Sequence, residues 1–546
     1  MTLAMVAQRL RRDLGDAAVI TDLATRRTYE CDGLTPYRCT PGLVVLPEEA
    51  SGVRAAMLAC RDAGMPFSAR GCDTGLSGRA LPEADGVLIV TSRMRRIIEI
   101  DLRNLRAVVE PGVVNLAITR EVAPGGYFYA GDPSSRRICS IGGDVAENSG
   151  GAHCVKYGFT VHHVTGLEVC TPGGELVQIG AGTAARSPGY DLTGVFVGAE
   201  GTLGIATKIA VRLLRAPEAA CTILAAFDRV ERAGAAVSAI IAAGIQPAAA
   251  EIMDALAIEA AEAAVHCGYP AGARALLIIE LDGPAVEVEA ETAAVTELCA
   301  EAFEIRTADD PARRAAIWKG RKSAFAAVGR ISRDYLAQDA VIPRAALAEV
   351  LGEIDALAGA AGLRVANLFH ACEGNLHPLV LYDGQLPGAR ERAEWVSGQI
   401  LDLCVARGGS ISGEHGVEVD RSATLFRMFS ADDLDTMRLV RSAFDPDGLA
   451  SPGKVFPAPG LCAERSPVAL APRPNAGPGR AGRDNRPGGA WGRNGAGGRH
   501  GIGEQRRIDH HGGIGDQPAI EDQGGIGDQP GFGDQPGNGE SDGTPE

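Results

Sequence analysis

The amino-acid sequence predicts an α+β fold of two domains, followed by a disordered tail. Short β-rich runs separated by glycine-rich turns fill residues 37–216, in a mixed order that differs from a regular βαβ alternation. Alanine-rich helical stretches flank apparent strands over residues 217–456, which predicts a second α+β domain with an antiparallel sheet. Residues 457–546 are mainly Gly, Pro, Arg, Asp and Gln, so they cannot bury enough apolar surface to fold.

The first domain is expected to follow a short helical lead-in, residues 1–36. A helix is expected at Glu48–Asp62, because apolar residues recur there at helical spacing, namely Val53, Ala56, Met57 and Cys60. Strands are expected at the β-rich runs VLIV, RIIEIDL, AVVEPGV and GLEVC, which begin at residues 87, 96, 107 and 166.

The second domain opens at Pro217 with a different pattern. Its expected helices are Val230–Ala243, Ala255–His266 and Val286–Phe303, with a strand at Ala275–Leu281. Residues 369–382 are expected to form a strand–turn–strand unit.

Charge and cysteine usage exclude several classes of protein. The net charge of −16 argues against a general nucleic-acid binder, which needs a basic face. There is no uninterrupted apolar run of the ~18 residues that a membrane span requires, and the N-terminus has no apolar region typical of an export signal. The thirteen cysteines never form a C-x-x-C pair, which argues against structural zinc and iron–sulfur motifs and predicts reduced thiols in the cytoplasm.

Three glycine-rich segments of the first domain predict a site for a flat ligand that carries phosphate. ARGCDTGLSG, at residues 69–78, exposes successive backbone N–H groups that can surround a pyrophosphate, although it lacks the Rossmann G-x-G-x-x-G. Ser140 is the expected N-cap of a helix of small residues, Ile141–Asn148, to which a flat ligand can come close. GAEGTLGIAT, at residues 198–207, is the third segment. An ordinary loop explains the first segment alone equally well, but not all three.

Two histidines of the second domain predict a metal site. A two-residue turn at Glu373–Gly374 would place His370 directly opposite His377, with their Cβ atoms ~5 Å apart. Two such imidazoles can share a divalent metal such as zinc with a carboxylate, for which Glu414 in SGEHG is the natural choice. The alternative is a pair of hydrogen-bonded histidines packed in a sheet.

These motifs together resemble a known family. RGCDTGLSG, the spaced motif GDPSS…SIGG…AEN…GG…KYG, and EGTLGI are similar to the FAD domain of flavoproteins of the p-cresol methylhydroxylase and vanillyl-alcohol oxidase type. FHACEGNLHP, SGEHG and AFDPDGLASPGK resemble the D-2-hydroxyacid dehydrogenase branch, and most closely the FAD-binding D subunits of glycolate oxidases. The resemblance runs from about residue 37 to residue 457.

The resemblance implies FAD bound by the first domain and substrate enclosed by the second. The FAD-binding residues that it implies are Arg70, Gly71, Cys72, Asp73, Thr74, Gly75, Asp132, Pro133, Ser134, Ser135, Gly142, Gly143, Asn148, Gly151, Tyr157, Gly158, Gly201, Gly204 and Ile205. Members with covalent flavin carry a histidine in the first glycine loop. This chain has Thr74 near that place, so dissociable FAD is expected.

The same resemblance implies oxidation of a small 2-hydroxy acid, glycolate first, to the 2-oxo acid. His370, His377 and Glu414 would hold a divalent metal, and His415 would take the hydroxyl proton. Arg321 resembles the arginine that binds the substrate carboxylate, although a solvated basic helix face is an equally good interpretation of its segment. D-lactate differs from glycolate by one methyl, and the sequence does not separate the two substrates.

Electrons must leave the reduced flavin, and this chain has no cysteine motif for a cluster. The resemblance therefore implies partners, an iron–sulfur subunit and a second FAD-type subunit of a glycolate oxidase complex. The expected location is the cytoplasm, with contact to the inner face of the membrane through these partners left open.

The chain departs from the family pattern at several positions. Asp73, Arg79, Asp144 and Glu418 replace the usual glycine or asparagine, and Cys372–Glu373 replaces Gly-Asp in the hairpin. A carboxylate at Asp73 would repel a pyrophosphate unless it turns outward. These changes leave an alternative of another class, a non-catalytic subunit that keeps the fold for assembly.

Overall fold

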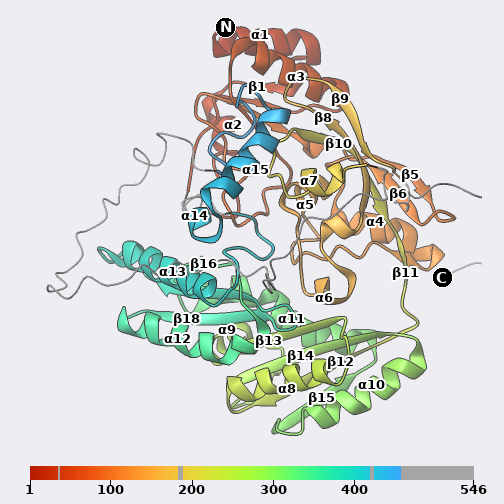
Figure 1. The fold of residues 1–546 in the computed structure, drawn as a ribbon, viewed down its shortest axis with the longest axis vertical. Coiled ribbons are helices and arrows are strands. Elements are labelled where there is room, and N and C mark those ends of the chain that lie inside the picture. The colour runs from red at the N-terminus through yellow and green to blue at the C-terminus, as the bar shows by residue number, and fades with distance from the viewer. Residues whose placement is uncertain (35–36, 183–188, 418–423, 457–546) are drawn as a thin grey trace, which may run out of the picture. The chain divides into compact units, whose positions relative to one another are not determined.

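The structure is a computed structural model that describes residues 1–34, 37–182, 189–417 and 424–456. The tail that is expected to be disordered, residues 457–546, lies outside the described residues, and so does Glu418. The described part contains three main sheets with helices on their faces, which confirms an α+β architecture with an antiparallel sheet in its second half (Figure 1). None of the described helices is long and apolar enough to cross a membrane.

The N-terminal sheet has the strand order β1-β2-β4-β3. Its strands are β1 (Val19–Ile20), β2 (Leu43–Val45), β3 (Phe67–Arg70) and β4 (Val87–Val90), and its helices are α1 (Leu3–Leu14), α2 (Leu23–Arg27) and α3 (Ala50–Ala63). β2, β3 and β4 are parallel, whereas β1 pairs with β2 antiparallel. The helix expected at residues 48–62 is therefore confirmed. It ends at Ala63 because Gly64 follows with a left-handed φ of 59°.

The second sheet is antiparallel, with the order β5-β6-β10-β8-β9. Its strands are β5 (Ile97–Asp101), β6 (Arg106–Val109), β8 (Val164–Cys170), β9 (Leu176–Gly180) and β10 (Ile205–Arg212), accompanied by α4 (Asn115–Val122), α5 (Ile141–Glu147), α6 (Cys154–Tyr157), α7 (Leu192–Phe196) and the small pair β7 (Tyr127–Phe128) and β11 (Leu214–Arg215). Ser140 caps α5 as expected, because its Oγ accepts the Gly143 N–H at 3.3 Å. Asn148 ends α5 with a left-handed φ of 51°.

The third sheet has eight strands in the order β15-β12-β14-β13-β18-β19-β16, with β17 also paired to β19. The strands are β12 (Ala219–Phe227), β13 (Ala249–Asp254), β14 (Ala275–Gly283), β15 (Glu304–Ala308), β16 (Asp334–Ala337), β17 (Ala340–Val341), β18 (Arg364–His370) and β19 (Asn375–Tyr382). All of its strand pairs are antiparallel.

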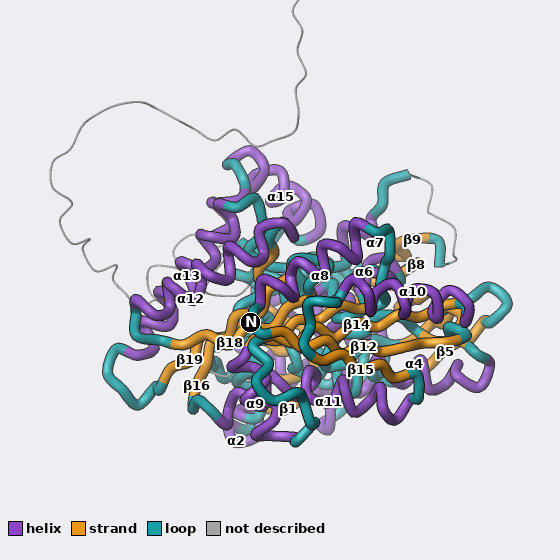
Figure 2. Tube along the Cα trace, turned by 90° about the horizontal axis from the view of Figure 1, so that it is seen from below, coloured by secondary structure: helices purple, strands orange, loops and turns teal. Residues whose placement is uncertain are grey.

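Helices cover both faces of this third sheet, and its central strands contribute buried apolar residues to both faces (Figure 2). One face packs against α8 (Val230–Ala242), α10 (Ala285–Leu298), α12 (Leu347–Ala360) and α13 (Ala389–Ala406). The other face packs against α9 (Ala255–Val265) and α11 (Pro311–Ala327). The three expected alanine-rich helices correspond to α8, α9 and α10, and α10 ends earlier than expected, at Leu298.

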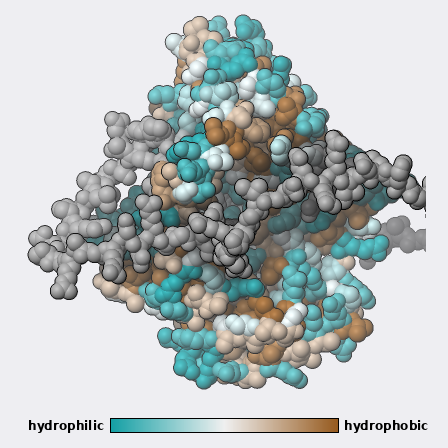
Figure 3. Space-filling model, viewed as in Figure 1, coloured by the Kyte–Doolittle hydropathy of each residue, from teal (hydrophilic) through white to brown (hydrophobic). Residues whose placement is uncertain are grey.

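The last described segment returns to the first half of the chain. After α14 (Leu425–Met428) and α15 (Ala431–Phe444), Ala450 lies beside Phe67 in a parallel bridge at the edge of β3. The backbone N–H of Phe67 donates to Leu449 at 2.9 Å, and that of Ser451 donates to Phe67 at 2.7 Å. The face that carries α13 and α15 mixes hydrophilic and hydrophobic residues (Figure 3). Trp395 on α13, Phe426 on α14 and Leu439 on α15 are exposed.

The histidine hairpin forms with a register other than the expected one. The turn spans four residues, 371–374, and not two, so His370 pairs with Asn375 and Leu368 pairs with His377. The N–H groups of Glu373 and Gly374 both donate to the His370 carbonyl, which closes this longer turn. The expected direct pairing of His370 with His377 is therefore wrong. The register moves by two residues, one full period of a strand, so both imidazoles still lie on the same face.

One face of the hairpin formed by β18 and β19 packs into the apolar core, and Phe369 on that face is fully buried. We expect Phe369→Ala to destabilise the protein by about 3–5 kcal/mol, because the substitution leaves a cavity in a packed core. Urea unfolding followed by tryptophan fluorescence measures the change. Phe303→Ala is the control, since Phe303 is 52% exposed and its loss should cost less than about 0.5 kcal/mol. Equal effects of the two substitutions would contradict the assigned core.

Candidate functional site

The three glycine-rich segments come together around one cavity of about 200 Å³. Most of the residues expected to bind FAD line it: Arg70, Gly71, Cys72, Asp73, Thr74, Gly75, Pro133, Ser134, Ser135, Gly142, Gly143, Gly201, Gly204 and Ile205. Segments that are far apart in the sequence thus contribute to a single concave site. Glu414 and His415 of the second half also line this cavity, so the histidine-bearing loop lies at its edge.

The backbone of this cavity is open where a ligand must approach it. A Cβ added at Gly75 would meet no atom within 4 Å, and one at Gly143 would meet only the Ser140 Oγ, at 3.3 Å. Ser77 lines the same cavity, and its buried hydroxyl has no hydrogen-bond partner within the described residues. Glycines that leave space and a buried polar group without a partner fit a bound polar ligand such as a dinucleotide.

Five of the residues expected at the FAD site have other contacts. Asn148 caps α5 and accepts the Val161 N–H at 2.9 Å. Gly151 packs against the Asp132 backbone, where a Cβ would come within 2.0 Å of the carbonyl oxygen. The Asp132 carboxylate lies 2.5 Å from the His153 Nδ1. The Tyr157 hydroxyl donates to Asp282 at 2.7 Å, and Gly158 has a φ of 87° beside His162. None of these five residues lines the glycine-rich cavity, so their part in FAD binding stays a prediction.

The unusual charges of the glycine loops are paired. Asp73 forms an ion pair with Arg70 at 2.8 Å, on the wall of the cavity. Burial raises the pKa of Asp73 to about 6, and Arg70 opposes that rise. Asp144 accepts the side-chain N–H of Asn115 at 2.7 Å, and burial raises its pKa to about 6 as well. In both carboxyl groups, burial therefore favours the protonated, uncharged form.

A buried charged group at this cavity is not evident in the sequence. Arg79 forms an ion pair with Glu200 at 2.6 Å, and Glu200 also accepts the Val417 N–H at 2.9 Å. Lys454 donates to the Arg79 carbonyl from the C-terminal segment. Burial and the nearby Glu200 raise the pKa of Glu147, whereas burial lowers the pKa of Lys454. Arg79, Glu147, Glu200 and Lys454 are more than 50 positions apart from one another, so no local sequence pattern indicates this group.

The predicted metal ligands converge on one carboxylate. The Nε2 atoms of His370 and His377 lie 3.3 and 3.2 Å from the Glu414 Oε1. The two rings are 5.0 Å apart between centroids and nearly perpendicular. All three ligand atoms lie within 4.8 Å of one another, which is the spacing of a group that could hold a metal ion.

Each of the two histidines is oriented through its other ring nitrogen. Glu251 is the cross-strand partner of His370, and its Oε1 lies 2.6 Å from the His370 Nδ1. The Nδ1 of His377 faces the Gln338 carbonyl at 3.4 Å and the Asp339 Oδ1 at 3.8 Å. Acceptors at Nδ1 favour a proton there and leave Nε2 as the atom available to a metal. Glu251 and Asp339 are thus functional candidates that the sequence patterns did not indicate.

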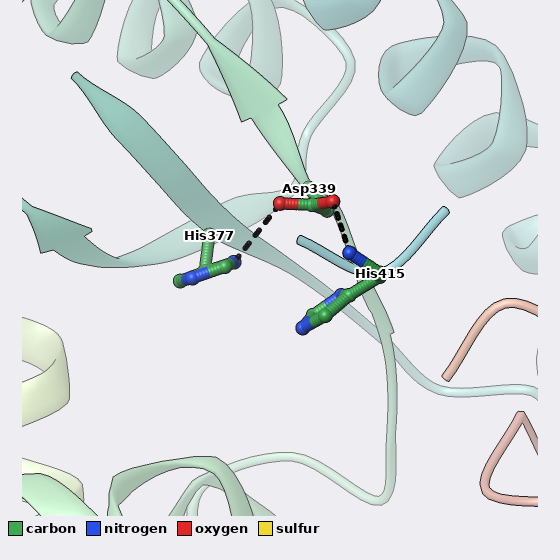
Figure 4. A group of neighbouring side chains, drawn as sticks. All are labelled: Asp339, His377 and His415. Atoms are coloured by element: carbon green, nitrogen blue, oxygen red, sulfur yellow. Dashed lines mark hydrogen bonds and ion pairs between the residues drawn. The ribbon is translucent and has the colours of Figure 1, made fainter. Parts of the chain in front are cut away.

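Asp339, His377 and His415 form a second group with the spacing of a metal site (Figure 4). The His377 and His415 rings stack at 5.1 Å with 18° between their planes. The Asp339 Oδ2 accepts the His415 backbone N–H at 2.8 Å, which fixes this loop beside the hairpin.

The protonation of this centre follows from its carboxylates. Burial alone would lower the pKa of His370, but Glu251 and Glu414 raise it well above the ordinary value. Burial lowers the pKa of His377, against a contribution from Glu414 that raises it. Burial alone would raise the pKa of Glu414, but the histidines, His370 first, hold it well below the ordinary value. Glu414 is therefore an ionised acceptor inside the protein.

Arg321 lines a second cavity of about 190 Å³, together with His370. Arg321 is 4% exposed and forms an ion pair with Glu251 at 2.6 Å, so the alternative of a solvated helix face is wrong. Lys322 and Arg137 line the same cavity and have no ion pair within the described residues. The cavity is therefore cationic in a chain whose net charge is −16, which suits a small anionic ligand.

His153 connects the first half of the chain to the third sheet. Its Nδ1 lies 2.5 Å from Asp132, and its Nε2 lies 3.4 Å from Glu280 on β14. Glu280 also accepts the Trp318 indole N–H at 2.7 Å. Burial alone would lower the pKa of His153, but the two carboxylates raise it to about 9. A charged imidazole thus links the two halves close to the second cavity.

Comparisons with known proteins agree with this geometry. Residues 41–180 match the family of FAD binding domains, and residues 216–455 match the C-terminal domain of FAD linked oxidases. The glycolate oxidase subunit GlcD of Escherichia coli (strain K12) is 50% identical over 438 residues, which cover 80% of this chain and 88% of that protein.

A mitochondrial D-lactate dehydrogenase (cytochrome) of Arabidopsis thaliana is 28% identical and covers 77% of this chain and 74% of that protein. The solved structure of p-cresol methylhydroxylase with bound substrate has a TM-score of 0.70 at 17% identity, over 83% of this chain and 97% of that one. This last likeness concerns the fold.

The bridge at His153 predicts a pH-dependent stability. Because the pKa of His153 is raised from 6.5 to about 9 in the folded protein, its contribution is full below pH 6.5 and is lost as the pH rises through 9. We expect His153→Gln to lower the free energy of unfolding by up to about 3 kcal/mol at pH 6, and by much less at pH 9.5.

Urea unfolding of both proteins across this pH range measures the difference. His266→Asn is the control, since His266 is exposed at the end of α9 and Asn tolerates its left-handed φ of 46°. A difference between wild type and His153→Gln that does not change with pH would contradict the assigned bridge.

Proposed function

The chain belongs to the family of FAD-linked oxidases, and we propose that it oxidises a small 2-hydroxy acid, glycolate first, to the 2-oxo acid. One observation carries the proposal. Pro133 and Ser134 line both the glycine-rich cavity and the cationic cavity. The group of His370, His377 and Glu414 lies where the two cavities adjoin, since Glu414 lines the first and His370 lines the second. A site for flavin, a site for a Lewis acid and a site for an anion would thus be next to one another.

The glycine-rich cavity would hold FAD. The backbone of residues 70–75 and of the start of α5 is open for the pyrophosphate, and the pairing of Asp73 with Arg70 reduces its repulsion of phosphate. FAD, when bound, supplies the two-electron acceptor for the reaction. We propose that FAD is held without a covalent bond, because the loop at residues 69–78 contains no histidine.

His370, His377 and Glu414 would hold a divalent cation, zinc being one candidate. Two imidazoles oriented by acceptors and one ionised carboxylate are a suitable donor set for such an ion. The cation, when bound, supplies a Lewis acid that lowers the pKa of the substrate hydroxyl.

Residues of this chain then bind and deprotonate the substrate. Arg321 presents a planar guanidinium to the cationic cavity, where it would bind the substrate carboxylate while Glu251 keeps it in place. His415 lines the flavin cavity beside Glu414, with Nε2 3.5 Å from the Glu414 Oε1. We assign His415 as the general base that accepts the hydroxyl proton at its imidazole. The first domain, residues 37–216, would thus carry the acceptor and residues 217–456 the substrate.

Two alternatives follow from the sequence. D-lactate would use the same groups, and one methyl group changes binding by only ~1–3 kcal/mol, so anaerobic flavin reduction by both acids is the experiment that separates them. A non-catalytic subunit is less well supported, because Arg70 neutralises Asp73 and Glu200 neutralises Arg79.

We also propose that the chain works in a complex. The related glycolate oxidase protein is a subunit by name, and an iron–sulfur subunit and a second FAD-type subunit would receive the electrons. Exposed Trp395, Phe426 and Leu439 supply apolar surface for such partners. A cytoplasmic location fits the free state of the described cysteines, and attachment at the inner face of the membrane would occur through the partners.

The base assignment predicts a kinetic defect with intact flavin. His415→Asn should lower kcat for glycolate by about 10²- to 10⁴-fold, because the hydroxyl proton then has no positioned acceptor. Stopped-flow reduction of the bound flavin measures this step, and the flavin absorbance measures FAD content. His162→Gln, an exposed histidine of the first half, should react like wild type. Normal turnover in His415→Asn with FAD bound would exclude His415 as the base.

The metal assignment predicts loss of activity on chelation. Prolonged dialysis against EDTA should reduce glycolate oxidation by at least tenfold and leave the flavin spectrum unchanged, because the ligands lie outside the glycine loops. Adding back Zn²⁺ or Mn²⁺ should restore the rate. Full activity in protein that elemental analysis shows to be metal-free would rule out a metal role.

A further inference from the structure

Asp339 lies where two parts of the site meet. β16 and β17 pair with β19 in one register, Ala337 with Leu379 and Ala340 with Leu376, so Asp339 between them falls opposite His377. On its other side, β17 pairs with the segment that leads into SGEHG, through a bridge from Val341 to Ser410. Asp339 therefore stands between the histidine hairpin and the loop that carries Glu414 and His415.

One oxygen of Asp339 organises that whole loop. Its Oδ2 accepts three successive backbone N–H groups, from Gly413 at 2.8 Å, Glu414 at 2.9 Å and His415 at 2.8 Å. It also accepts the Ser412 hydroxyl at 2.7 Å. Three consecutive N–H groups directed at one anion fix the backbone between them, so the directions of the Glu414 and His415 side chains are fixed too. Asp339 is only 1% exposed, so water does not compete for these bonds.

The other oxygen of Asp339 faces the hairpin. The Oδ1 lies 3.8 Å from the His377 Nδ1 and has no hydrogen-bond partner within the described residues (Figure 4). Together with the Gln338 carbonyl, it presents acceptors to Nδ1. When a cation is bound by Nε2, which lies 3.2 Å from the Glu414 Oε1, the proton of His377 would be on Nδ1, and these acceptors are placed to receive it.

We propose that Asp339 is the positioning residue of this enzyme. It sets the orientation of Glu414 and His415 through Oδ2 and the tautomer of His377 through Oδ1. The proposal rests on the proposed function, in which Glu414 and His377 bind a metal and His415 is the base. Asp339 need not bind the metal itself, since Oδ2 already accepts four hydrogen bonds.

Asp339→Asn is the decisive variant, because it keeps the size of the side chain. Its one carbonyl oxygen can still accept the four donors, and its NH₂ group then replaces the oxygen that faces His377. A donor at that place favours an unprotonated Nδ1 and a proton on Nε2, which blocks the metal-binding nitrogen. We expect the Kd for Zn²⁺ to rise by about 10- to 100-fold and kcat for glycolate to fall by a similar factor, with FAD content unchanged.

Equilibrium dialysis of chelator-treated protein against Zn²⁺ gives the Kd, and the flavin absorbance gives FAD content. Asp334→Asn is the matched control, since Asp334 lies on the neighbouring β16 and its carboxylate accepts, among the described residues, the Gly384 N–H at 3.0 Å. It should bind Zn²⁺ and oxidise glycolate like wild type. An unchanged Kd and kcat in Asp339→Asn would overturn the proposal.

A second measurement separates this proposal from the proposed function. Backbone ¹H–¹⁵N spectra of the metal-free protein report the hydrogen bonds of the Gly413, Glu414 and His415 amides without any turnover. We expect these three amide protons to shift upfield in Asp339→Asn, because a neutral amide oxygen is a weaker acceptor than a carboxylate oxygen, and identical shifts in both proteins would overturn the role of Asp339. A wild type that neither binds Zn²⁺ nor oxidises glycolate would contradict the proposed function, while the amide shifts still decide about Asp339.

Ser412→Ala covers the case in which Asp339→Asn does not fold. It removes one of the four donors to Oδ2 and leaves the carboxylate in place, so we expect the Kd for Zn²⁺ to rise by roughly fivefold. An unchanged Kd in Ser412→Ala would then count against the proposal.

Discussion

The buried carboxylate of Glu414 is the constraint on which the site depends. An ionised group without water must have partners, and the partners of Glu414 come from a hairpin and from its own loop. Two of them, His370 and His377, need acceptors of their own at Nδ1, and the neighbouring strands supply Glu251 and the region of Asp339. The strand pairing of the third sheet therefore determines which side chains surround Glu414.

The sequence predicts the composition of the site better than its geometry. Histidines at 370 and 377 and the SGEHG motif indicate the correct group, since their side chains do converge. The expected pairing fails because the turn has four residues, and turn length depends on hydrogen bonds to the His370 carbonyl that composition does not reveal. The alternation of strand faces tolerated this error of two residues, and an error of one would have separated the histidines.

Other residues could not be found from local patterns. Glu251 is an acid within an apolar strand, and Asp339 precedes a strand of two residues, so neither belongs to a motif. The role of each residue depends on a cross-strand neighbour more than 35 positions away in the sequence, His370 for Glu251 and His377 for Asp339. The glycine loops were easier to interpret, because open backbone is a local property, and most of their residues line one cavity. Asn148, Tyr157 and Gly158 show that nearness in sequence does not place a residue on a cavity wall.

The return of residues 449–454 to the first sheet bears on the order in which the protein can fold. Ala450 pairs with Phe67 at the edge of β3 and Lys454 donates to Arg79, although these partners lie more than 370 positions apart along the chain. During translation, the N-terminal half therefore leaves the ribosome with an unpaired edge at β3. Its two neighbouring carboxylates, Glu147 and Glu200, are then without the positive charge of Lys454. The flavin half matures only after nearly the whole folded region has been synthesised, so premature termination near residue 440 would spoil the domain that was translated first.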